Sequence, residues 1–145
     1  MALSPNMAFN SKSMERNIDT DLSDTWVLPA ALRQLEEYGE LDLVEELIAI
    51  FQTDTAERLE LLARAVETDD YVTARQEAHT IKGSALQVGA VRLAERCRQM
   101  EMEARKPQPG SLVALFRALL SSFDEVRGVI AAGRGPANGS RHYGQ

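Results

Sequence analysis

The stretch of residues 78–90, with the sequence AHTIKGSALQVGA, holds the side chains best suited to chemistry. His79 is one of only two histidines in the 145-residue chain, and Lys82 and Gly83 follow it by three and four positions. Residues spaced in this way share one face of a helix. An imidazole on such a face can act as a nucleophile that carries a covalent group. The neighbouring cations, Lys82 one turn on and Arg75 one turn back, fit a phosphoryl group, whose oxygens they could neutralise.

If this stretch is helical, its side chains divide into two faces. One face is small and apolar and is expected to be buried; it holds Ala74, Ala78, Ile81, Ala85 and Val88. The other face places His79 among two cations, an amide and a bare patch of backbone; it holds Val72, Arg75, Gln76, Lys82, Gly83 and Leu86. The second face has the composition of a functional site and not that of a buried core.

Gly83 needs a physical reason, because a glycine inside a helix costs about 1 kcal/mol relative to alanine. At this position any side chain is expected to cover the imidazole of His79, so the glycine suggests the close approach of another protein. The alternative is a half-exposed surface histidine beside a packing glycine. The combination of His79, Lys82 and Gly83 on one face favours the site.

Other chemistries for His79 find less support. A metal site needs three or four ligands, and no second histidine or cysteine lies at ligand spacing on this helix. A hydrolase would need a nucleophile, yet Cys97 is expected to point into the core. There is no glycine-rich phosphate loop. We therefore predict neither a metal nor a cofactor bound by this chain, and we interpret six carboxylates within residues 36–46 as a solvated helix start.

The elements that must position this face are all predicted to be helices. Apolar spacing predicts a short helix that starts near Pro29 and stops at Gly39, then long helices over about 40–67, 71–88, 90–105 and 111–132. Trp26 is expected to anchor the short helix. Asp69 and Ser111 are the predicted N-caps of the second and last long helices, and Gly89 is expected to end the second. The first long helix should bury Leu43, Leu47, Ile50, Phe51, Thr55, Leu59, Leu62 and Val66.

No segment has the alternating pattern of a strand, so the expected fold is all-α. We expect an up-down-up-down four-helix bundle with a short additional N-terminal helix. We expect the bundle over residues 25–132, a flexible segment over 1–24 and a disordered tail over 133–145. The formal net charge of −6 argues against nucleic-acid binding. No apolar stretch could span a membrane, and the single cysteine fits a reducing compartment. We expect a cytoplasmic monomer without a signal peptide.

Residues 78–90 resemble the signature of histidine-containing phosphotransfer (HPt) domains of multistep two-component phosphorelays. The similarity continues through Cys97 to Glu101 and covers about residues 26–132. It implies that His79 accepts the phosphoryl group, that Lys82 neutralises it and that Gly83 admits the partner. Glu101 matches a position where family members often place a Glu or Gln that hydrogen-bonds the ring. The alternative for Glu101 is a surface charge paired with Arg98 or Arg105.

The resemblance also implies the partners. They are a hybrid sensor histidine kinase and response-regulator receiver domains, and the receiver would supply both the Mg²⁺ and the acceptor aspartate. The expected docking surface is the rim around His79, formed by Val72, Arg75, Gln76, Leu86 and Gln87. The chain has no kinase ATP-binding segment and no receiver-type acidic pocket, so we expect it to relay phosphoryl groups and not to phosphorylate itself. Because no further domain is apparent in the sequence, we expect a stand-alone relay. A non-catalytic helical adaptor and the phosphoacceptor domain of a chemotaxis-type histidine kinase remain alternatives.

Overall fold

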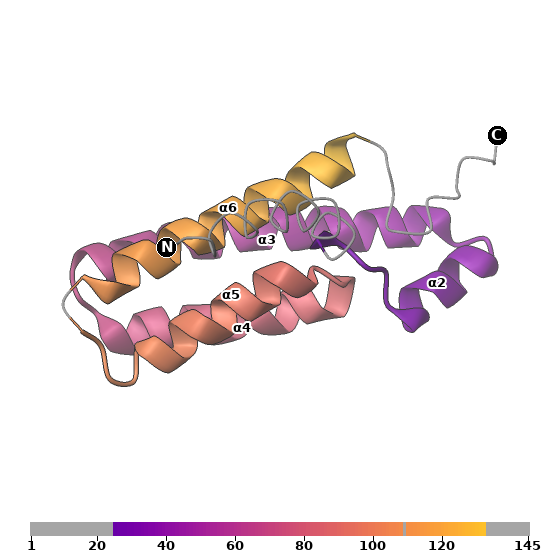
Figure 1. Cartoon of the computed structure of the whole chain (residues 1–145). Helices are drawn as coiled ribbons and strands as arrows, with labels where there is room; N and C mark the ends of the chain where they lie inside the picture. The colour runs from indigo at the N-terminus through magenta and orange to yellow at the C-terminus, as the bar shows by residue number, and fades with distance from the viewer. Residues whose placement is uncertain (1–24, 109, 133–145) are drawn as a thin grey trace, which may run out of the picture.

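The computed structural model describes residues 25–108 and 110–132, and this part of the chain forms helices without any strand. The helices are α2 (Ala30–Glu37), α3 (Leu41–Glu67), α4 (Tyr71–Val88), α5 (Val91–Glu103) and α6 (Ser111–Ala131). Helices α3 to α6 form the bundle, in which each helix packs against the next and α6 packs back on α3 (Figure 1). The predicted all-α bundle is confirmed. The predicted flexible segment 1–24 and the tail 133–145 lie outside the described residues.

The main core lies between α3, α4, α5 and α6. Its largest fully buried apolar side chains come from all four helices; they are Leu62, Ile81, Leu93, Met100, Leu119 and Val126. Full burial of such a side chain stabilises the fold by about 1.5–3 kcal/mol. The small residues Ala74, Ala78 and Ala85 of α4 are also fully buried, as their spacing predicts. This buried stripe fixes how α4 is rotated in the bundle, and the rotation leaves the opposite face exposed.

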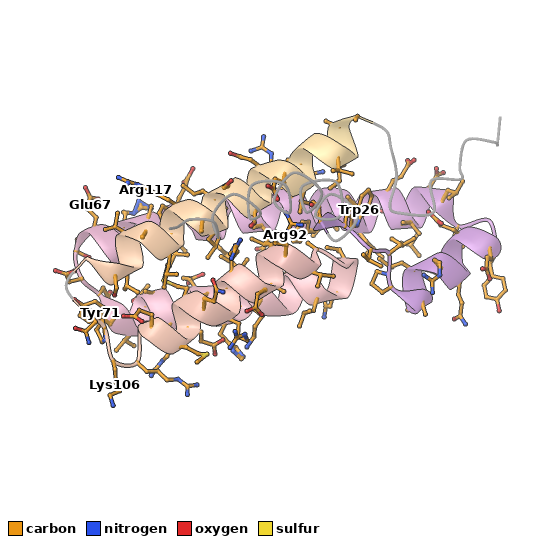
Figure 2. The ribbon with its side chains drawn as sticks, viewed as in Figure 1. Trp26, Glu67, Tyr71, Arg92, Lys106 and Arg117 are labelled. Atoms are coloured by element: carbon orange, nitrogen blue, oxygen red, sulfur yellow. The ribbon has the colours of Figure 1, made fainter. Side chains whose placement is uncertain are left out.

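A second, smaller core holds α2 against α3. It is formed by Trp26, Leu28, Leu32, Val44 and Ile48. Trp26 is 6% exposed, and its indole Nε1 donates a hydrogen bond to the carbonyl oxygen of Val88 at the end of α4, at 2.9 Å. Figure 2 shows Trp26 beside α3, away from the end of the bundle where Glu67 and Tyr71 lie. The predicted anchoring role of Trp26 is therefore confirmed.

The inward face of the first half of α3 was predicted wrongly. Leu43, Leu47 and Ile50 are 40%, 36% and 56% exposed, whereas Val44 and Ile48 are buried. This part of α3 extends beyond α4 and α5, and α2 lies against it (Figure 1). Its inward face is therefore selected by the Trp26 cluster. Both apolar stripes have helical spacing, so periodicity alone could not choose between them.

Two predicted N-caps also differ in the structure. Asp70, and not Asp69, caps α4: its Oδ1 accepts a hydrogen bond from the backbone N–H of Thr73 at 3.1 Å, while Asp69 takes a left-handed conformation with φ +56°. Ser111 is the first residue of α6 and its hydroxyl donates to the carbonyl of Gln108, so it does not cap the helix. In both helices the N-cap lies one residue from the predicted position, at Asp70 for α4 and at Gly110 for α6.

Gly89 ends α4 in the left-handed conformation, with φ +88°, as predicted. A Cβ atom there would collide with the backbone carbonyl of Val27, whose N–H donates to the Gly89 carbonyl at 2.8 Å. Trp26 and Val27 thus cover the end of α4. None of the described helices is long and apolar enough to cross a membrane.

Candidate functional site

The imidazole of His79 is presented from the middle of α4. Asp70 caps the start of this helix, Gly89 ends it, and its buried alanine stripe packs it closely on the other helices. The His79 side chain is 66% exposed, although Ala78 beside it is fully buried. A reactive group on a packed helix has little freedom to move, yet this ring remains accessible to a protein that approaches from outside.

Glu101 of α5 holds one nitrogen of the ring. Its Oε2 lies 2.8 Å from His79 Nδ1, and the residue is only 8% exposed. An ionised carboxylate can only accept hydrogen bonds, so the hydrogen lies on Nδ1. In the neutral form of the ring, the other nitrogen, Nε2, then carries the free lone pair. This geometry is what a nucleophile that reacts through Nε2 requires.

Lys82 binds the second oxygen of the same carboxylate. Its Nζ donates to Glu101 Oε1 at 2.8 Å. Burial by itself would raise the pKa of Glu101, but the hydrogen bonds from Lys82 and His79 outweigh it and hold this pKa below its ordinary value. The alternative partner Arg98 is bound instead by Glu95, through contacts of 2.6 and 2.9 Å. Both oxygens of Glu101 are therefore used within one site.

Gly83 leaves open space beside this site. A Cβ atom built on Gly83 meets nothing within 4 Å, so packing among residues 25–108 and 110–132 does not require a glycine here. The expectation that any side chain here would cover the imidazole is wrong for a methyl group, which would not touch the ring. No packing contact among the described residues therefore explains the glycine.

The residues around His79 lie on one exposed face of α4, here called the α4 face. Val72 and Leu86 are 57% and 54% exposed, Gln76 and Gln87 are exposed, and Arg75 is half-buried. Met102 of α5, next to Glu101 in the chain, is also 55% exposed, and the sequence did not single it out. Leu47 and Ile50 of α3, which their spacing assigned to the core, are also exposed. Val72 and Leu86 share the face of α4 that carries His79, and large exposed apolar side chains beside a reactive group are typical of a protein-binding surface.

Comparison with known proteins places these residues in a family context. The model of the Hpt domain family matches residues 46–127, which is more than half of the chain. Among solved structures, the crystal structure of histidine-containing phosphotransfer protein B (HptB) from Pseudomonas aeruginosa PAO1 matches with a TM-score of 0.64 and 31% identity. The match covers 73% of this chain and 92% of that chain. No curated protein sequence matches. His79, Lys82, Gly83 and Glu101 all lie inside the range of the family match.

Proposed function

The chain belongs to the Hpt domain family, and from that premise we propose that it relays phosphoryl groups between receiver-domain aspartates through His79. Family membership supports a histidine phosphotransfer role in phosphorelays. The observation that carries the assignment to this residue is the 2.8 Å contact between His79 Nδ1 and Glu101 on an otherwise exposed imidazole. It orients a nucleophilic nitrogen toward the outside of the bundle.

The proposed step begins with attack of the His79 Nε2 lone pair on the phosphorus of a receiver aspartyl phosphate. The N–P bond forms as the P–O bond to the aspartate breaks, and the aspartate leaves as a carboxylate. Nε2 has no hydrogen to lose, because the ring hydrogen lies on Nδ1. The ring becomes positively charged during attack, and the Glu101 carboxylate stabilises that charge. Transfer to the next receiver reverses the same bond changes.

Lys82 is proposed to stabilise the phosphoryl group on His79. Its ammonium lies one helical turn from the histidine and is bound to Glu101 in the free protein. A phosphoryl group on Nε2 offers it negatively charged oxygens as additional partners. Phosphoryl transfer depends mainly on positioning and on charge neutralisation, and the receiver would supply the Mg²⁺. This chain would contribute the oriented nucleophile and the cation.

The α4 face is the proposed docking surface for receiver domains and for a hybrid sensor histidine kinase. Val72 and Leu86 would provide apolar contact, and Gln76, Gln87 and Arg75 the polar rim. We further propose that the protein acts in the cytoplasm as a monomer; its one cysteine, Cys97, is buried and free.

The assignment is tested by charging purified receiver domains with acetyl phosphate and adding this protein. We expect a retarded, acid-labile band of phosphorylated protein on a phosphate-affinity gel. This band should be absent for His79→Gln, whose helical circular dichroism should match that of the wild type. Leu86→Asp should weaken transfer, whereas Val113→Asp on α6, at a similarly exposed position, should not. Labelling that persists in His79→Gln would exclude His79 as the acceptor. Receiver binding without any transfer would favour an adaptor instead.

A further inference from the structure

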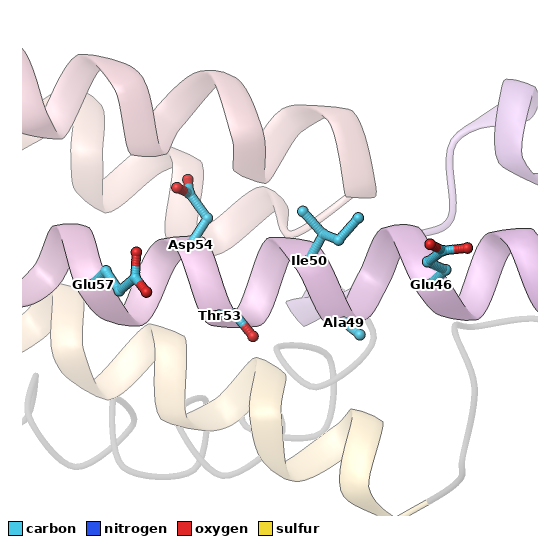
Figure 3. A pocket seen from close by; sticks show the side chains of 6 residues that line it. All are labelled: Glu46, Ala49, Ile50, Thr53, Asp54 and Glu57. Carbon is cyan, nitrogen blue, oxygen red and sulfur yellow. The ribbon is translucent and has the colours of Figure 1, made fainter.

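Arg58 joins α3 to α4 at a point close to His79 in the chain. Its Nη1 donates to Glu77 Oε1 of α4 at 3.0 Å, and its Nε donates to Asp54 Oδ2 of its own helix at 3.1 Å. Asp54 is one of the residues that line a shallow pocket on α3, and Figure 3 shows its carboxylate pointing toward α4. Because Asp54 holds the guanidinium from one side, Arg58 is fixed in the direction of Glu77.

Glu77 is largely removed from water at this contact. Its side chain is only 16% exposed, and its carboxylate accepts from Arg58. Removing one partner of a buried ion pair is costly, because the remaining charge is left without compensation. Without Arg58, the Glu77 carboxylate would regain water by moving away from the core, and α4 would have to turn with it. Arg58 therefore acts on the orientation of the helix that carries His79.

The polar contacts of α4 lie on both sides of its buried stripe. At about 100° per residue, Glu77 lies about 60° to one side of the direction in which the stripe points, and Lys82 lies about 80° to the other side. Glu77 is bound by α3, and Lys82 is bound by Glu101 of α5 at 2.8 Å. A turn of α4 that carries one of these side chains outward carries the other inward. The two ion pairs together therefore oppose rotation of α4 in either direction.

The ion pairs matter because the packed face of α4 consists largely of small side chains. Ala74, Ala78 and Ala85 are fully buried, and alanine methyl groups form shallow ridges between packed helices. The stripe decides which side of α4 faces the core, but it resists a small turn less than interlocked large side chains would. At His79, on the outside of the helix, such a turn changes the position of the ring relative to Glu101.

We infer that Arg58 is a positioning residue for phosphoryl transfer. Through Glu77, it holds α4 at the rotation in which the Nδ1 hydrogen of His79 reaches Glu101 and Nε2 faces outward. Its effect passes through α4, because its hydrogen bonds go to Glu77 and Asp54 and not to the ring. The inference rests on the proposed function, since the group that Arg58 positions is the proposed nucleophile.

The first test measures kcat and KM for phosphoryl transfer from a charged receiver to the full chain. Arg58→Met keeps much of the aliphatic length of the side chain and removes its charge. We expect kcat to fall about tenfold because the nucleophile is misplaced, while KM stays within about twofold because the α4 face is still present. Adding Glu77→Gln to Arg58→Met should recover part of kcat, since the carboxylate that lost its cation is then replaced by a neutral amide.

The second test observes the ring of His79 directly and needs no receiver. Nitrogen-15 NMR at about pH 9, above the ordinary pKa of histidine, distinguishes a hydrogen on Nδ1 from one on Nε2. The wild type should show mainly the Nδ1–H form of His79, and Arg58→Met should show a larger share of the Nε2–H form. The spectrum of His79→Gln identifies the signals of the other histidine, His142.

Two other arginines provide matched controls. Arg92→Met breaks an ion pair with Glu125 at 3.1 Å, which joins α5 to α6. It should lower the melting temperature and leave both kcat and the tautomer of His79 unchanged. Arg64→Met removes the same charge from an exposed position farther along α3, and it should also leave kcat and the tautomer unchanged.

Wild-type kcat and an unchanged tautomer in Arg58→Met, with only a lower melting temperature, would show a purely structural ion pair and overturn the inference. An equal loss of kcat in Arg92→Met would also overturn it, and so would a double variant that is no faster than Arg58→Met. If no receiver charges His79, the proposed function fails, while the tautomer in the same variants still decides whether Arg58 positions the ring.

Discussion

Replacing Gly83 with alanine should make the protein more stable and a poorer phosphotransfer partner. The added methyl group meets nothing within 4 Å in the free protein, so only the helix preference of the backbone changes. Alanine is favoured over glycine inside a helix by about 1 kcal/mol. For a domain of this size, that gain raises the melting temperature by about 4 °C.

The same methyl group would stand where a docked receiver must approach His79. Forcing an extra methyl into a close-packed contact costs about 1–3 kcal/mol, which corresponds to about a 5- to 150-fold loss in kcat/KM. Stability and transfer are therefore expected to change in opposite directions. If Gly83 mattered only for the folding of this protein, Gly83→Ala would not increase stability while it slowed phosphoryl transfer.

The assay pairs thermal unfolding with the rate of transfer from an acetyl phosphate-charged receiver. Gly128→Ala is the control: Gly128 is also an exposed glycine inside a helix, and a Cβ there also meets nothing within 4 Å. It should give a similar gain in melting temperature with an unchanged transfer rate. A Gly83→Ala protein that transfers at the wild-type rate, or that is less stable than wild type, would refute the reasoning.

Three further outcomes follow from the described geometry. Because Glu101 has a lowered pKa, its carboxylate stabilises the fold above its ordinary pKa of 4.5, and this contribution is lost as the pH falls through the folded-state pKa. Glu101→Gln should therefore flatten the loss of unfolding free energy between about pH 5 and pH 3 in urea titrations, and an unaltered slope would contradict the contact with His79. Asp70→Ala should lower the melting temperature by removing the cap of α4, whereas Asp69→Gly should raise it by relieving a positive φ; the reverse order would restore Asp69 as the cap. Gly89→Ala should destabilise the protein and raise the exposure of the single tryptophan to acrylamide quenching, because the new side chain displaces the Val27 carbonyl; wild-type quenching would show that the end of α4 can adjust.

Local sequence signals determined most of the helices and the position of the site on one of them. The buried alanine stripe of α4 is unambiguous because it contains no polar residue, whereas the opposite face holds His79, Lys82 and Gln76, so its period fixes which side faces solvent. Gly89 marked the end of α4 because few other residues take a positive φ readily. His79, Lys82 and Gly83 share a face by spacing alone, and no tertiary contact is needed to place them together.

The tertiary structure decided which face of α3 is buried and which residues contact His79, because residue spacing alone could not. Leu43 and Val44 belong to two apolar stripes of equal period, and only the packing of Trp26 and α2 shows which stripe is buried. Glu101 lies 22 positions after His79 on another helix, so its contact with the ring depends on how α4 and α5 pack. Its second contact, with Lys82, depends on the same packing. The sequence alone determined which residues could do chemistry, because the helical period is a local property; the orientation of the ring was decided by the bundle, because only packing brings a carboxylate from α5 against Nδ1.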